Sequence, residues 1–143
     1  MENIKEYFNE IEKLVGKDAL FEAEEKLVAL LNKSERKESY IKDILELMEK
    51  NPLTDWGMPG ALVHFVEACD DEVYKKLLLE SVMRCPTVHT LWMLNREYNG
   101  RSDSELQEYL SVLKKIANDS SLHQLIINTA KEFLEFQISR KNQ

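Results

Sequence analysis

The segment CPTVHTLWMLNREYN, residues 85–99, determines how we expect this chain to fold. A helical periodicity begins at Thr87 and continues to Tyr98, with Leu91 on one side of the helix and Met93 on the other. Because large apolar side chains lie on opposite sides of one helix, other helices must cover both sides. The segment therefore predicts the central helix of a stack, in an all-α fold.

The same helix carries the polar residues His89, Asn95 and Arg96, which have two interpretations. They can be core groups whose hydrogen bonds are satisfied inside the protein, with Arg96 paired to an internal carboxylate. They can also contact a partner directly. We favour the first interpretation, because most buried polar side chains in proteins have internal partners.

Helical periodicity extends outward from this segment to both ends of the chain. About eight helices are expected, and their apolar positions fall within residues 4–15, 20–31, 40–48, 61–68, 73–83, 87–98, 102–117 and 122–138. No segment alternates apolar and polar residues as a strand would. Short connections favour antiparallel neighbours, so we expect a single domain over residues 1–143. Both an irregular HEAT-like stack and a closed helical bundle fit this pattern.

Several helix ends have recognisable local signals. Gly16 is expected to end the first helix, and Asp18 to cap the second. Ser102 followed by Glu105 matches a capping box, in which each side chain satisfies a backbone N–H of the first turn. These signals predict where the chain turns but carry no information about function.

Composition restricts the classes of function that we consider. The chain has 143 residues, of which 43% are hydrophobic and 31% charged, with a net charge of −7. It has no apolar run long enough to span a bilayer and no secretory signal at its start, so we expect a cytoplasmic protein that does not enter membranes. Its negative charge disfavours direct binding of nucleic acid and suits a basic partner.

Catalysis, metal binding and cofactor binding have no support in the sequence. Cys69 and Cys85 are expected to be buried, reduced thiols, and no CxxC or HExxH motif is present. The three histidines, His64, His89 and His123, do not stand in a nucleophile–base pattern, and no glycine-rich phosphate loop occurs. We therefore expect a protein that is not an enzyme and takes no cofactor or metal.

An acidic group close to the irregular segment NPLTDWGMPG, residues 51–60, is the candidate partner-binding site. Trp56 is expected to serve as an aromatic anchor, with a rim of acidic side chains around it. The acidic residues are Glu67, Asp70, Asp71 and Glu72. Helix capping and the helix dipole already explain Asp70 and Asp71. A solvated face with no partner is the alternative for each acidic residue taken alone.

Two segments of the chain resemble a known class of proteins. WGMPGALVHFVE, residues 56–67, and PTVHTLWMLNR, residues 86–96, are similar to small helical immunity proteins of bacterial polymorphic toxin systems. That class includes the immunity proteins of contact-dependent growth inhibition. The resemblance covers roughly residues 52–100, and the flanking helices add a compatible size and helical character.

This resemblance implies a definite function. Such a protein binds the C-terminal toxin domain encoded beside it and occludes the active site in the cytoplasm. Many of these toxins are basic nucleases, including tRNA-cleaving domains of the EndoU or barnase-like kind. The alternative is a helical-repeat adaptor or regulatory subunit with another protein partner. A small enzyme, with a pocket around His64, His89 or Cys85, is the third hypothesis.

Overall fold

The computed structural model describes residues 4–57, 59–99 and 101–141, which form eight α-helices, one short 3-10 helix and no strand. The α-helices are α1 (Ile4–Leu14), α2 (Leu20–Leu31), α3 (Ile41–Lys50), α4 (Ala61–Glu67), α5 (Asp71–Arg84), α6 (Val88–Tyr98), α7 (Asp103–Ala117) and α8 (Gln124–Lys141). The 3-10 helix, Lys37–Tyr40, leads into α3. The all-α prediction is confirmed.

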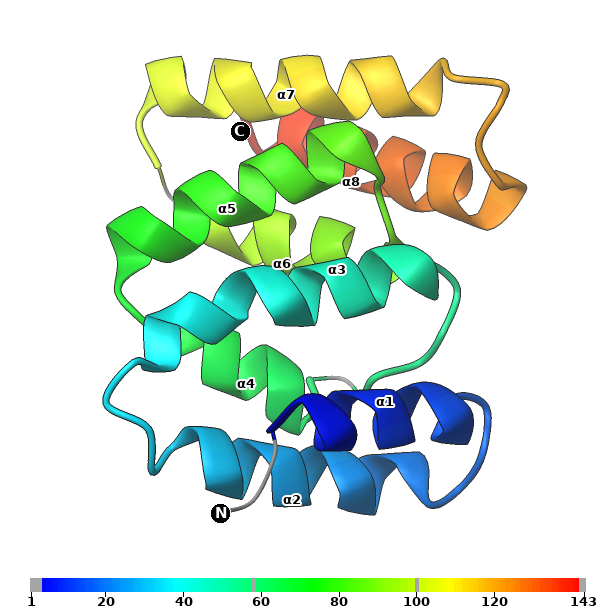
Figure 1. Cartoon of the computed structure of the whole chain (residues 1–143). Helices are drawn as coiled ribbons and strands as arrows, with labels where there is room; N and C mark the ends of the chain where they lie inside the picture. The colour runs from blue at the N-terminus through cyan, green and yellow to red at the C-terminus, as the bar shows by residue number, and fades with distance from the viewer. Residues whose placement is uncertain (1–3, 58, 100, 142–143) are drawn as a thin grey trace.

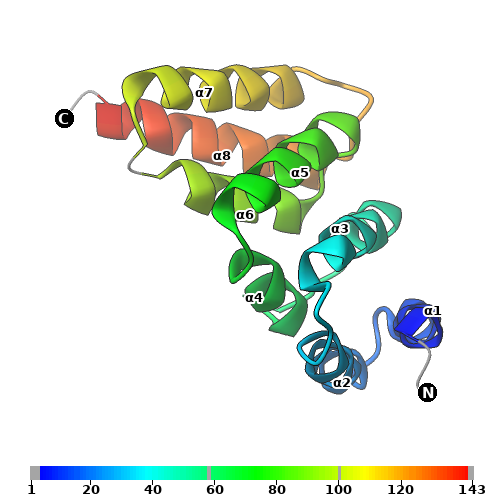
Figure 2. The ribbon, with the colours of Figure 1, turned by 60° about the vertical axis from the view of Figure 1, so that its left-hand side comes forward.

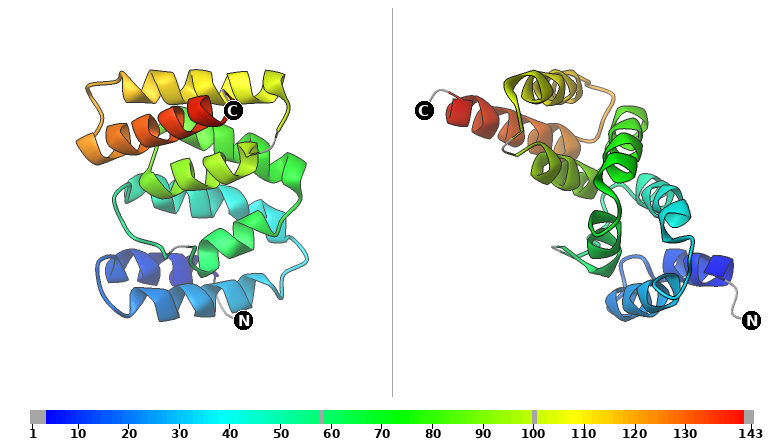
Figure 3. Two further views of the ribbon diagram at one scale, coloured as in Figure 1. Left: turned by 180° about the vertical axis from the view of Figure 1, so that it is seen from behind. Right: turned by 90° about the vertical axis from the view of Figure 1, so that its left-hand side faces the viewer.

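Consecutive helices pack as pairs, α1 with α2, α3 with α4, α5 with α6 and α7 with α8. The pairs lie one above another, so the first members form a front layer and the second members a back layer (Figure 1). Turned views show the two rows of helices side by side (Figure 2) and the back layer of α2, α4, α6 and α8 from behind (Figure 3, left). The chain is therefore an open stack of helix pairs and not a closed bundle.

Helix α6 occupies the central position that its sequence predicts. It contacts α3, α5 and α7 of the front layer and α8 of its own layer. Its side chains Leu91, Met93, Leu94 and Tyr98 are all fully buried. Thr87 begins the helix with a capping box, in which its hydroxyl accepts from the Thr90 N–H and the Thr90 hydroxyl accepts from the Thr87 N–H.

The other helix ends agree with the sequence in part. Gly16 follows α1 with a φ of 81°, a conformation that glycine adopts without steric cost. Ser102 caps α7, but the side chain of Glu105 pairs with Lys75 of α5 and does not complete the capping box. Asp18 does not cap α2, since the N-cap residue is Ala19 and no side chain makes that hydrogen bond.

The segment between α3 and α4 folds into a tight turn that carries Trp56 into the core. Trp56 is only 1% exposed. A Cβ atom on Gly60 would lie 1.8 Å from the Trp56 carbonyl oxygen, so only glycine fits there. Gly57 has a φ of +97°, and its N–H donates to the Asp55 carboxylate. These constraints fix the turn against the back layer.

A buried carboxylate, Glu24 of α2, lies beside the start of α4. Glu24 is 0% exposed, and neither of its carboxylate oxygens has a hydrogen-bond partner among the described residues. Burial raises the pKa of Glu24 to about 8, and the nearby carboxylates of Asp55 and Glu25 act in the same direction. Glu24 is therefore mostly protonated in the folded protein at neutral pH.

Candidate partner-binding face

Trp56 does not stand where a partner could reach it. Its ring lies in the core, and its backbone N–H donates to Nε2 of His89 over 3.1 Å. The expectation of an exposed aromatic anchor at Trp56 is therefore wrong. Sequence reasoning failed here because the tight turn that Gly57 and Gly60 permit folds the ring inward, although the segment is irregular and polar.

The four acidic residues lie at the α4–α5 junction but do not form a rim around Trp56. Glu67 accepts from Nε and Nη2 of Arg96, at 2.9 and 3.1 Å. Asp70 caps α5 by accepting from the N–H groups of Glu72 and Val73. Glu72 itself is exposed in the first turn of α5. Two of these acids therefore have structural roles within the protein.

The remaining acid, Asp71, belongs to an ionic cluster that joins α5, α6 and α7. Arg101 donates to Asp71 over 2.9 Å and also contacts the carboxylates of Glu97 and Glu105. Arg101 lowers the pKa of Asp71, whereas burial and the neighbouring Asp71 raise the pKa of Glu97 to about 7. The cluster ties the last helix pair to the middle of the stack.

The polar residues of α6 have the internal partners expected of core groups. Asn95 accepts from the hydroxyl of Tyr109 over 2.7 Å and from the side-chain amide of Gln137 over 3.0 Å. The Gln137 amide also donates to Asn99 over 2.8 Å. Arg96 pairs with a carboxylate as expected, but this pair lies at the surface, where the Arg96 side chain is 39% exposed. The bonds of Asn95 and Gln137 confirm the core interpretation for Asn95, and they fix α6 against α7 and α8.

Several of the exposed large apolar side chains belong to helices α6 and α8 of the back layer. Trp92 of α6 is 39% exposed, and Leu125 and Phe136 of α8 are each 48% exposed. Leu125 and Phe136 occupy one stripe of α8, beside the stripe that contacts α6 through Phe133 and Gln137. Trp92 contacts Phe133 on this neighbouring stripe.

We call the resulting surface the back face, defined by Glu67, Trp92, Arg96, Leu125 and Phe136. Its aromatic and charged side chains are held in place by their neighbours. Trp92 packs edge-on against Phe133, with ring centroids 5.1 Å apart, and Arg140 lies over the ring of Phe136. Trp92 and Arg96 thus reach the surface with restricted conformations, which lowers the entropic cost of binding a partner.

A small hollow of about 80 Å³ opens on the back face. It is lined by Gly57, Pro59, His89, Trp92 and Arg96. His89 is 6% exposed, and its Nε2 lies 3.7 Å from the Asp55 carboxylate. Burial lowers the pKa of His89, which keeps the imidazole neutral at physiological pH even though Asp55 acts in the opposite direction.

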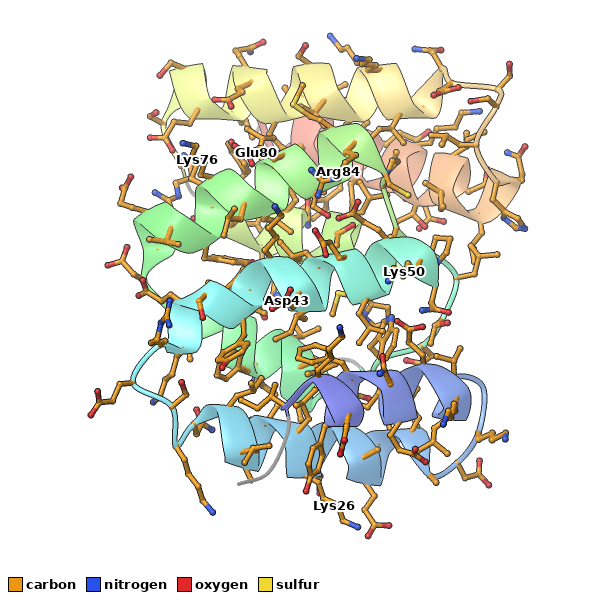
Figure 4. All side chains as sticks on the ribbon, viewed as in Figure 1. Lys26, Asp43, Lys50, Lys76, Glu80 and Arg84 are labelled. Atoms are coloured by element: carbon orange, nitrogen blue, oxygen red, sulfur yellow. The ribbon has the colours of Figure 1, made fainter. Side chains whose placement is uncertain are left out.

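The front layer presents a different surface. Lys76, Glu80 and Arg84 alternate in charge along the exposed side of α5 at intervals of four residues, as expected of a solvated helix (Figure 4). Arg84 makes a bidentate pair with Glu49 of α3, at 2.8 and 2.7 Å. Met83, at 58% exposed, is the large apolar side chain that protrudes most from α5.

Four larger grooves lie elsewhere, and two of them separate the α1–α2 region from α3 and the segment that follows it. One, of about 330 Å³, separates α1 from α3, and the 3.7 Å pair between Lys50 and Glu12 crosses its rim. The other, of about 590 Å³, lies between the α1–α2 turn and residues 51–55. Among the described residues, no buried polar atom without a partner lines either groove.

The cysteines lie at helix ends and are free. Cys69 donates to the Phe65 carbonyl, Cys85 donates to the Glu49 carbonyl, and burial raises the pKa of both thiols. Within the described part of the chain, no group of three or more His, Cys, Asp or Glu side chains is placed to hold a metal ion. No described helix is long and apolar enough to cross a membrane.

Of the residues predicted to bind a partner, Glu67 alone belongs to the back face. The sequence predicts that other helices cover both sides of the central helix, so it did not single out Trp92 as a binding residue. The sequence of the last helix could have indicated the back face. It has apolar residues on more sides than its neighbours α6 and α7 can cover. Comparisons with protein-family models, curated proteins and solved structures find no match for this chain.

Proposed function

We propose that this protein is an immunity protein that binds and neutralises a cognate bacterial toxin domain. The back face would be its binding surface. The proposal joins the resemblance of residues 56–67 and 86–96 to immunity proteins with the structure of the regions that carry it. Those residues form α4, α6 and the turn that precedes α4, and they contribute most of the back face.

The single observation that supports protein binding most strongly is the exposure of Trp92 beside Arg96 on a rigid helix. Tryptophan and arginine are the residues that most often dominate binding energy at protein interfaces. Leu125 and Phe136 extend the apolar area on α8, and the Glu67–Arg96 pair gives it a polar edge. An apolar centre with a polar rim is the usual arrangement of such interfaces.

Electrostatics suggest the class of toxin. The net charge of −7 favours rapid encounter with a basic domain, and domains that cleave nucleic acid present basic surfaces to their substrate. The mechanism is occlusion, in which the immunity protein covers the substrate surface of the nuclease in the cytoplasm. A specific complex would bury about 1,200–2,000 Å² of surface in total.

Co-expression with the polypeptide encoded directly upstream tests this proposal. That polypeptide should arrest growth when expressed alone, and growth should recover when this chain is present and forms a stable complex with it. An upstream product that is neither toxic nor bound by this chain would contradict the proposal.

A helical-repeat adaptor or regulatory subunit is the second candidate. The open stack of helix pairs favours it, because stacked pairs in other proteins present extended binding surfaces. The two candidates use the same back face and differ in the partner. A stable complex with a harmless protein through Trp92, without any effect on growth, would support the adaptor.

A further inference from the structure

We propose that the hollow between His89, Trp92 and Arg96 binds a neutral carbonyl oxygen from the partner, either a backbone carbonyl or the side-chain amide of Asn or Gln. The proposal rests on the proposed function only for the identity of the partner. The chemistry of the hollow follows from the hydrogen bonds around it.

The first step concerns the tautomer of His89. Its Nε2 accepts a hydrogen bond from the Trp56 backbone N–H, so this nitrogen carries no proton in the neutral ring. The proton of a neutral imidazole must then lie on Nδ1, which becomes a donor. Nδ1 has no acceptor among the described residues and is not among the polar atoms sealed from solvent. Because His89 lines the hollow, the hollow is where Nδ1 can meet a ligand.

The second step concerns the other side chains that line the hollow. Arg96 uses Nε and Nη2 for Glu67, which leaves Nη1 without an acceptor in the described part of the chain. The indole N–H of Trp92 likewise donates to no described residue, although its ring is packed against Phe133. Three of the residues that line the hollow therefore carry a donor without an acceptor in the described part of the chain. A carbonyl oxygen of a ligand can replace the water that otherwise accepts from these donors.

The third step distinguishes a neutral oxygen from an anion. Glu67 neutralises Arg96 through a bidentate pair, and Asp55 lies 3.7 Å from the ring of His89. With His89 neutral, the surroundings of the hollow carry a small negative charge, which repels a carboxylate or phosphate. A neutral carbonyl accepts the same hydrogen bonds without this repulsion.

The fourth step concerns size and shape. A volume of about 80 Å³ holds one amide group but not a ring or a long side chain. The indole of Trp92 and the ring of Pro59 form apolar walls against which the carbon atoms next to the carbonyl can pack. The partner would therefore insert the tip of a loop, with a small polar group at its end.

NMR of the free protein tests the first three steps without any partner. We expect long-range ¹H–¹⁵N spectra at pH 7 to show neutral His89 with its proton on Nδ1. Addition of N-methylacetamide should shift the indole N–H signal of Trp92 in a saturable manner, while acetate should shift it less. Trp56, the other tryptophan of the chain, is buried and serves as an internal control. A proton on Nε2, a larger response to acetate, or no response of Trp92 to the amide would overturn the proposal.

Affinity measurements with the toxin test the same proposal in the complex. Trp92→Phe removes the indole N–H but keeps an aromatic ring against Phe133. One lost hydrogen bond of about 0.5–1.5 kcal/mol corresponds to a loss of affinity of roughly twofold to twelvefold. Unchanged affinity for Trp92→Phe, together with a large loss for Trp92→Ala, would overturn carbonyl recognition and leave the proposed function intact. A toxin that does not bind the wild type would contradict the proposed function, and the amide titration would still decide the chemistry of the hollow.

Discussion

The front and back layers of this stack share the same helical scaffold but differ in what they expose. On the front layer, α5 presents alternating charges, and its Arg84 is engaged by Glu49 of α3. On the back layer, α6 and α8 present Trp92, Leu125 and Phe136. Both surfaces are compatible with the fold, so stability does not explain the difference. A surface that retains exposed aromatic groups in fixed positions is typical of one that binds another protein.

The two layers also differ in how tightly their connecting turns are packed. The turn before α4 contains two conformationally restricted glycines, Gly57 and Gly60, and the buried Glu24 of α2 lies beside it. The described part of the front layer contains no glycine with a positive φ except Gly16, which lies in the connection after α1. A tightly constrained turn and a buried carboxyl group therefore lie in the back layer, next to residues that line the hollow of the back face.

The largest expected effect comes from Gly60→Ala. The new Cβ would overlap the Trp56 carbonyl oxygen at 1.8 Å, and backbone atoms cannot move aside cheaply. We expect a loss of at least about 3 kcal/mol in the free energy of unfolding, at the upper end of single substitutions, or a failure to fold. Chemical denaturation monitored by circular dichroism measures it.

Gly16→Ala is the matched control for this substitution. Gly16 also has a positive φ, but nothing lies within 4 Å of its added Cβ. We expect a cost of about 1–2 kcal/mol, from the left-handed backbone alone. Equal effects of the two substitutions would contradict the close packing that we assign to the turn before α4.

The next effect is the pH dependence due to Glu24. Its pKa rises from 4.5 to about 8 on folding, so the contribution of Glu24 to stability is fully present below pH 4.5 and is lost as the pH rises to 8. Glu24→Gln should stabilise the protein by about 3 kcal/mol at pH 7 and much less at pH 4. Denaturation midpoints of both proteins across this range measure the difference.

Glu97, whose pKa is raised to about 7, adds to the same trend in both proteins. The difference in the free energy of unfolding between wild type and Glu24→Gln therefore reports the ionisation of Glu24 alone. A stabilisation that does not change with pH would show that Glu24 ionises in the folded state as freely as in the unfolded chain.

The next largest effect is a loss of affinity for the toxin, which we expect from a substitution on the back layer and not from one on the front layer. Trp92→Ala is expected to weaken binding of the toxin by at least about 2 kcal/mol, roughly thirtyfold, because it removes the central aromatic group. Met83→Ala removes a more exposed apolar side chain from α5 and should change the affinity by less than about 0.5 kcal/mol. Calorimetry of both variants measures these effects. The opposite order would assign binding to the front layer.

The smallest expected effect concerns the acidic residues. Glu72→Lys should slow association with a basic toxin at low salt and weaken the binding free energy by less than about 1 kcal/mol. Both effects should disappear as salt screens the charges. Glu80→Lys makes the same charge change further along α5 and serves as the control. Glu67→Lys would also expel Arg96 from its ion pair and is less informative. If Glu72→Lys and Glu80→Lys slow association equally, overall charge and not the α4–α5 junction governs encounter.

The sequence predicts the fold well because helical periodicity and caps are local signals. Thr87 and Asp70 cap the helices that they precede, and the apolar residues on both sides of α6 correctly indicate a central helix. Asp18 illustrates the limit, since the first turn of α2 begins one residue later, at Ala19, without a side-chain cap.

The candidate site was less predictable, because burial in an irregular segment depends on tertiary contacts. Trp56 appeared accessible in a polar loop, but its N–H reaches His89, 33 residues further along the chain. Trp92 was expected to be covered as part of a central helix, but no further helix of the described residues lies behind α6 to bury it. Periodicity indicates which side of a helix is apolar and cannot indicate whether another helix covers it.

Side-chain NMR of the complex tests the central claim most directly, by observing both layers in one sample. The indole N–H of Trp92 reports on the back face, and the methyl group of Met83 reports on the front layer. On addition of the cognate toxin, we predict a large shift of the Trp92 signal and an unchanged Met83 signal. A shifted Met83 signal with an unchanged Trp92 signal would contradict the assignment of partner binding to the back face.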